Sequence, residues 1–221
     1  MGLDRMGDRM DDLGAPVARR TQADRRAESG RGLVQAAVSI VSQRGVGAAT
    51  FEAIGAEAGY SRSLVTQRFG SKRGLIDAVI EHAASSFGPQ RLAERAQSLS
   101  GLEGLLLLLD TYLIELSTSR ELRTYFMLLS SAVAELSELR AAFAAEHERV
   151  KGHLAALVDK GRADGSIRPG VDADAAALMI GSLQLGLSMQ LLVDPAMDLD
   201  PIRRIAVSTV RLSFAGPPAG G

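Results

Sequence analysis

The sequence predicts an all-α fold made of a small N-terminal domain and a larger C-terminal one. Apolar residues recur at helical spacing along most of the chain, and Gly and Pro separate these periodic segments. No segment alternates apolar and polar residues as a half-buried strand would. With 46% hydrophobic and 23% charged residues, the 221-residue chain has the composition of a globular protein.

Residues 1–28 are predicted to form a disordered tail. They are rich in Arg, Asp and Gly and show no apolar periodicity. The alternative is a basic arm that enters the minor groove of DNA. The acidic residues interspersed among the arginines favour the disordered tail.

Residues 29–87 are predicted to hold four helices. Leu33, Ala37 and Ile40 fall on one face of the first, which begins near Arg31 and ends at Gly45. Good N-cap residues then precede three more helices, expected over 51–58, 62–69 and 72–87, the caps being Thr50, Ser61 and Ser71. The last of these helices links the small domain to the larger one.

Residues 88–215 are predicted to form the larger domain, and residues 216–221 a second disordered tail. The helices of the larger domain are expected over 102–116, 121–135, 137–163, 173–193 and 202–214. Residues 175–193 carry no charge and approach the length of a membrane span. Because Ser182, Gln184, Ser188 and Gln190 interrupt this segment, we expect it to be buried between protein surfaces and expect no membrane.

Several classes of protein are disfavoured by what the sequence lacks. Without Cys it has no disulfide, thiolate metal site or cysteine nucleophile. None of the three His has metal-ligand spacing, and no nucleophile–base pair or phosphate loop is found. We therefore expect no enzyme, no metal and no other cofactor. The N-terminus also lacks the apolar core of a signal peptide, so a cytoplasmic location is expected.

Residues 50–69 have the arrangement of a helix-turn-helix, in which the second helix lies in the DNA major groove. At about 100° per residue, Val65 and Phe69 share one side of that helix, and Ser63 and Gln67 point the opposite way. The helix lies within residues 58–76, which contain Arg and Lys but no acid. Its outward face therefore offers hydrogen-bonding groups and positive charge to base edges and phosphates.

The same segment resembles the TetR family of bacterial transcriptional regulators. The residues that match the family's pattern are Ala36, Ala37, Gly45, Thr50, Ile54, Gly55, Ala58, Gly59, Ser61, Phe69, Ser71, Lys72 and Leu75. The motif-bearing part covers residues 31–87, and the later helices are similar to the family's ligand-binding and dimerisation domain only in number and size. The resemblance implies a three-helix DNA-binding domain and a homodimer that binds a palindromic operator.

The resemblance also implies which residues contact DNA. The base-contacting positions are Arg62, Ser63, Leu64 and Gln67, and the phosphate-contacting positions are Thr50, Thr66, Arg68 and Lys72. The family usually has Tyr where Thr66 stands and a small polar residue where Leu64 stands. The phosphate contact at Thr66 is therefore in question, and Leu64 either touches a thymine methyl group or packs within the domain.

The larger domain is expected to hold an effector pocket and a dimer interface. The predicted lining of the pocket, suited to a mainly apolar effector, is Leu105, Leu109, Phe126, Met127, Met179 and Leu183. Packing in the core is the alternative for each of them. The predicted interface is Gly181, Ser182, Gly186, Ile202 and Val210, since small residues suit close helix packing. Burial of both helices within one subunit is the alternative.

These features favour a ligand-responsive regulator, a repressor released from its operator by a small molecule. The alternative is a helical-bundle enzyme or carrier that keeps a helix-turn-helix only as scaffold. DNA binding at two salt concentrations distinguishes them, because only the regulator should lose affinity steeply with salt. We expect an effector signal to pass through residues 71–87, the only segment that joins the two domains along the chain.

Overall fold

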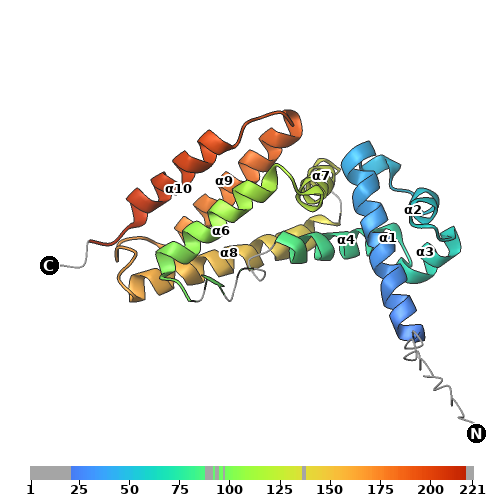
Figure 1. Ribbon diagram of the computed structural model, residues 1–221, viewed down its shortest axis with the longest axis horizontal. Coiled ribbons are helices and arrows are strands. Elements are labelled where there is room, and N and C mark those ends of the chain that lie inside the picture. The colour runs from blue at the N-terminus through green and yellow to red at the C-terminus, as the bar shows by residue number, and fades with distance from the viewer. Residues whose placement is uncertain (1–20, 88–91, 93–94, 97, 136–137, 218–221) are drawn as a thin grey trace, which may run out of the picture.

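The computed structural model describes residues 21–87, 92, 95–96, 98–135 and 138–217. Within them every regular element is helical, apart from one isolated bridge between Ile167 and Ala215. Figure 1 shows α1 (Gln22–Arg44), α2 (Phe51–Ala58) and α3 (Arg62–Phe69) together at one end, with α4 (Lys72–Phe87) leading away from them. The predicted all-α fold with an N-terminal helix-turn-helix is confirmed.

Helix α1 begins at Gln22, well before the predicted start near residue 31. A capping box explains the difference: the Thr21 hydroxyl accepts from the Asp24 N–H at 3.1 Å, and the Asp24 carboxylate accepts from the Thr21 N–H at 3.0 Å. The first turns are exposed on all sides, so they show no apolar periodicity. The predicted disorder is wrong for residues 22–28, and residues 1–20 lie outside the described part.

The small domain is built around fully buried side chains from each of its first three helices, and one large aliphatic side chain of each helix has 0% exposure. These are Leu33, Ile54 and Val65. The hydroxyls of Thr50 and Ser61 cap α2 and α3 by accepting from Ala53 and Leu64, which confirms the predicted starts. A Cβ at Gly55 would lie 2.7 Å from the Tyr60 carbonyl oxygen, so only glycine allows α2 to approach the turn this closely.

Helix α7 (Arg120–Ala134) lies between the two ends of the molecule and packs against both α1 and α4. The fully buried Thr124 hydroxyl donates to the Val38 carbonyl oxygen of α1 at 3.2 Å. The larger domain therefore contacts the small domain through α7 and α1, in addition to the covalent connection through α4. The expectation that residues 71–87 alone transmit a signal overlooks this contact.

The larger domain is completed by α6 (Gly101–Leu116), α8 (Arg140–Ala163), α9 (Ala173–Val193) and α10 (Asp200–Phe214). Helix α8 packs against α6 and α9, and α6 also packs against α10. By length and composition α9 could cross a membrane, and 33% of its apolar window is buried in the bundle, where the helix packs against α8. The predicted C-terminal disorder is wrong at Gly216, whose N–H donates to Ser166 O at 2.9 Å, and residues 218–221 lie outside the described part.

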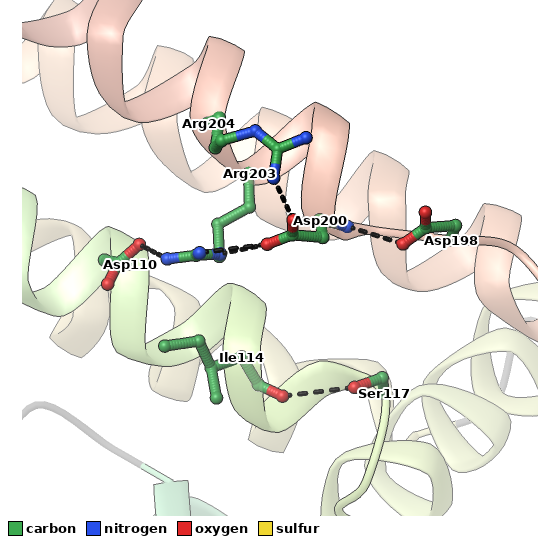
Figure 2. A network of polar contacts seen from close by, with 7 residues as sticks. All are labelled: Asp110, Ile114, Ser117, Asp198, Asp200, Arg203 and Arg204. Atoms are coloured by element: carbon green, nitrogen blue, oxygen red, sulfur yellow. Dashed lines mark hydrogen bonds and ion pairs between the residues drawn. The ribbon is translucent and has the colours of Figure 1, made fainter.

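Ion pairs fasten α10 to α6. Figure 2 shows Arg203 between two carboxylates, with nitrogen–oxygen distances of 2.5 Å to Asp110 of α6 and 2.9 Å to Asp200 of α10 itself. Asp200 also pairs with Arg204, and Arg211 pairs with Glu103 of α6. These contacts fix one face of α10 on α6, so the opposite face is turned outward.

Candidate nucleic-acid interface and ligand cavity

The outer face of α3 is polar and exposed. Arg62, Ser63, Thr66, Gln67 and Arg68 are all exposed, and so are Thr50 and Lys72 at the starts of α2 and α4. The opposite face of α3 is held by the fully buried Val65. Leu64 is half-buried, so part of its side chain is open to a thymine methyl group. All eight predicted DNA contacts are thus at least partly open to solvent, on α3 itself or at the starts of α2 and α4.

The hydroxyl groups of Thr66 and Thr50 differ in how readily each can donate a hydrogen bond to a phosphate. The Thr66 hydroxyl donates to the Arg62 carbonyl oxygen at 3.2 Å, within α3 itself. Its hydrogen must turn away from the backbone before it can reach a phosphate. The Thr50 hydroxyl accepts from the Ala53 N–H at 3.1 Å, and its O–H is able to donate to an anion at the helix N-terminus.

Arg62 is oriented by an ion pair with the preceding helix. Its Nε lies 3.0 Å from the Glu52 carboxylate of α2, and both side chains are well exposed. An exposed ion pair contributes only about 0–1 kcal/mol. Glu52 can therefore hold the guanidinium beside the outer face of α3 and release it to a base at small cost.

Arg68 lies over a glycine of α1. A Cβ built on Gly30 would be 2.8 Å from both Nε and Nη2 of Arg68, closer than carbon and nitrogen approach without displacement. The guanidinium therefore rests against the α1 backbone where a side chain would otherwise stand. Gly30 is outside the matching pattern noted in the sequence, and only the folded arrangement reveals its contact.

A cavity of about 170 Å³ lies between α8 and α9, with side chains of α6 and α7 also lining it. Tyr112 of α6 hydrogen-bonds the Ser188 hydroxyl of α9 at 2.6 Å, and burial raises the pKa of its phenol. Tyr125 of α7 packs edge-on against Phe126 and Phe143, each with ring centroids 5.1 Å apart. Burial likewise raises the pKa of Tyr125, so the walls of the cavity are neutral aromatic rings at pH 7.

Charged groups line the α8 side of this cavity. The Glu146 carboxylate accepts from Arg149, and Lys151 pairs with Glu148 at 3.1 Å and more loosely with Asp174 at 3.8 Å. Burial lowers the pKa of His147, although the nearby Glu146 partly opposes that shift. Among the described residues, no group of three or more His, Asp or Glu could hold a metal ion.

Comparison with known proteins identifies the family. The family model "Bacterial regulatory proteins, tetR family" matches residues 33–79, and the model "BetI-type transcriptional repressor, C-terminal" matches residues 101–214. The chain belongs to the TetR family. A comparison with curated proteins gives no match.

Solved structures of TetR-family proteins share the fold of this chain. A protein from Rhodococcus sp. assigned to the family is 19% identical with a TM-score of 0.74, over 86% of this chain and 100% of its own. SmeT, the repressor of a Stenotrophomonas maltophilia multidrug efflux pump, is 24% identical with a TM-score of 0.69, over 87% and 93%. A protein from Saccharomonospora viridis solved with choline is 20% identical with a TM-score of 0.73, over 86% and 100%.

The cavity between α8 and α9 differs from the predicted effector pocket in most of its residues. Of the predicted set, Phe126 alone lines it. Leu105 and Leu109 are fully buried in the core, as the alternative interpretation held, and Met127 and Leu183 are partly buried against it. Met179 is 50% exposed on α9. The lining residues of α8 were not predicted, although Glu146, Val150 and Leu154 recur at the four-residue spacing of one helical face.

The predicted interface residues divide between the surface and the core. Gly181, Ser182 and Gly186 of α9 are exposed or half-buried, and a Cβ at either glycine would meet nothing within 4 Å. Gly181 and Ser182 also line the cavity between α8 and α9. Ile202 of α10 is half-buried. Val210 is only 2% exposed and belongs to the subunit's own core, so its place in the predicted interface is wrong.

Large apolar side chains are exposed on α9 and α10, and their exposure was not predicted from the sequence. Their exposed fractions range from 50% to 83%, and they are Leu178, Met179 and Val193 of α9 and Ile205 and Leu212 of α10. The sequence signal for α10 was its strong amphipathicity. Which of its two faces turns inward is decided by the pairing with α6.

Proposed function

We propose that this TetR-family protein is a repressor that binds a palindromic operator as a homodimer and is released by a mainly apolar small molecule. The observation that carries the proposal is that the outer face of α3 is exposed, polar and basic, while the fully buried Val65 packs the inner face of the same helix into the core. In this proposal Arg62, Ser63, Leu64 and Gln67 contact bases, and Thr50, Thr66, Arg68 and Lys72 contact phosphates.

Dimerisation is assigned to the outward faces of α9 and α10. The exposed apolar side chains there would be costly in a monomer, and open glycines allow a second helix to approach closely. Gly181, Ser182, Gly186 and Ile202 stay in the proposed interface, joined by Ile205 and Leu212. Two-fold symmetry of such a bundle would present two copies of α3 to a palindrome.

The effector is assigned to the cavity between α8 and α9, in an effector-binding and dimerisation domain of residues 88–215. Residues 29–87 form the DNA-binding domain in this proposal. An effector releases DNA only if it prefers a conformation that holds the two α3 helices at the wrong separation. We place the protein in the cytoplasm and propose no catalytic role, since the exposed chemistry lies at the DNA-binding surface.

Selection from random duplex DNA tests this function. A recovered palindrome supports the proposal, and binding to it should weaken steeply between low and high salt. Arg68→Ala and Lys72→Ala should each reduce the salt slope by about one unit per subunit. Arg168→Ala, with the same loss of charge at an exposed site far from α3, serves as the control. No enrichment of any sequence would favour a carrier or enzyme instead.

A further inference from the structure

One carboxylate is shared by two hollows of the larger domain. Glu146 of α8 lines the cavity described above and also a groove between α8 and α4. Its side chain is only 12% exposed, and its carboxylate accepts from Nε of Arg149 at 2.8 Å and from Nη2. If a group in the cavity binds the Glu146 carboxylate, Arg149 in the groove therefore loses its hydrogen-bond acceptor.

The groove holds two opposite charges that are not paired with each other. Nη1 of Arg149 is buried and has no hydrogen-bond partner among the described residues, and the same holds for Oδ1 of Asp77. Asp77 lies on α4, and its other oxygen is 3.7 Å from Arg73. Both side chains line this groove. Because buried charged atoms without partners are costly, contact between the two would be favourable.

The cavity itself favours a positive ligand. Its ionised lining residues are two acids, Glu146 and Glu148, against one base, Lys151. Lys151 and Glu148 pair with each other, and Lys151 also lies 3.8 Å from Asp174, while burial lowers the pKa of His147 and so favours the neutral ring. The faces of Tyr125 and Phe126 add negative potential beside Glu146.

We propose that the effector is an organic cation with an apolar body, and that its charge takes the Glu146 carboxylate from Arg149, whose released guanidinium then pairs with Asp77 of α4. The proposal rests on the proposed function, because it supplies the coupling between cavity and DNA. Helix α4 follows α3 directly and carries Lys72 at its first position. A new bond from α8 to Asp77 therefore acts on the helix that positions the DNA-binding surface.

The ligand class is tested by calorimetry with three probes that share one apolar body: 4-phenylbutylamine, 4-phenylbutanol and 4-phenylbutanoate. The ammonium should bind the wild type about tenfold more tightly than the alcohol, and the carboxylate most weakly. Glu146→Gln should abolish the preference for the ammonium. Glu148→Gln, which removes an exposed acid from the same cavity, should retain most of it. The proposal is overturned if the ammonium does not bind at millimolar concentration, or if its preference survives Glu146→Gln.

The exchange of partners is tested separately with two variants. Arg149→Met removes the competitor for Glu146, so the ammonium should bind more tightly than to the wild type, by about tenfold. Asp77→Asn should bind the ammonium more weakly than the wild type, because the released Arg149 loses its new partner. Ammonium bound to this variant should no longer change DNA affinity, whereas in the wild type it should weaken DNA binding roughly 5- to 150-fold. Glu81→Gln, the other acid of α4 in the groove, is the control and should respond like the wild type.

The two sets of measurements separate the possible failures. Probe binding is read without DNA, so a protein that recognises no DNA would refute the proposed function while the preference for the ammonium still stood. Normal DNA release in Asp77→Asn would refute the exchange of partners while leaving the DNA-binding function intact. Weaker ammonium binding in Arg149→Met would also refute it, because Arg149 would then support the ligand rather than compete with it.

Discussion

Gly30→Ala is expected to weaken DNA binding by displacing Arg68, although Gly30 itself is not one of the predicted DNA contacts. The added Cβ would lie 2.8 Å from two nitrogens of Arg68, so one partner must move. The Arg68 guanidinium is the far end of a flexible side chain, whereas Gly30 belongs to the backbone of α1. The guanidinium will therefore move, and the fold will not.

The expected magnitudes have opposite signs for stability and for binding. Replacing Gly by Ala inside a helix stabilises it by about 0.5–1 kcal/mol, so the free energy of unfolding should hold or rise. One phosphate contact contributes about 0.9 to the slope of log affinity against log salt, so losing it in both subunits of the proposed dimer lowers the slope by about 1.8 and weakens binding about 60-fold near 0.1 M salt. This applies to every duplex sequence alike, because phosphates carry no sequence information.

Salt titrations of the wild type, Gly30→Ala, Arg68→Ala and the double variant provide the assay. The two single variants should lose the same slope, and the double variant should lose no more than either, since both act on one guanidinium. Gly32→Ala is the matched control: its Cβ would meet only Tyr60, at an ordinary 3.8 Å. An unchanged salt slope in Gly30→Ala, or full additivity with Arg68→Ala, would refute the argument.

Three further predictions concern specificity, assembly and pH. Arg62→Ala should cost about 1–3 kcal/mol at one operator position and little on random DNA; equal losses on both would exclude a base contact. Gly186→Glu should give a folded monomer by sedimentation, while Gly152→Glu, at an equally open glycine of α8, should stay dimeric. The Asp164 carboxylate accepts hydrogen bonds from Ser166 and from the Gly101 N–H, which lower its pKa from 3.8. Its contribution to stability is thus present above pH 3.8 and lost as pH falls through the lowered pKa, so Asp164→Asn should flatten acid unfolding there.

The parts of the fold that the sequence predicted well are those fixed by neighbouring residues. Thr50, Ser61 and Ser71 cap helices at the expected positions because a cap needs only a backbone N–H two or three residues away. The outer face of α3 follows from helical geometry for the same reason. The early start of α1 escaped prediction because its first turns carry no apolar face, although the Thr21 and Asp24 spacing was a usable signal.

The cavity could not be located from the sequence because its lining comes from four helices. Leu105 and Tyr112 of α6 are seven residues apart on the same side of the helix, and only Tyr112 lines the cavity, so the lining depends on which turn of α6 packs beside it. Both positions belong to the same amphipathic helix, and apolarity alone selects the more buried one. The residues best suited to bind a ligand are the less apolar ones, Tyr112 and Glu146, which a search for an apolar pocket passes over.

Tertiary packing also explains why the prediction that an effector signal passes through residues 71–87 was incomplete. Chain order identifies α4 as the covalent connection, and α4 does border the groove that contains Arg149. However, Tyr125 and Phe126 line the cavity from α7, and the adjacent Thr124 hydrogen-bonds α1 from within the core. Any displacement of α7 by a ligand would strain that buried bond, since Thr124 has no exposure to water that could replace it. The cavity is thus in mechanical contact with both sides of the small domain, with α4 on one and α1 on the other.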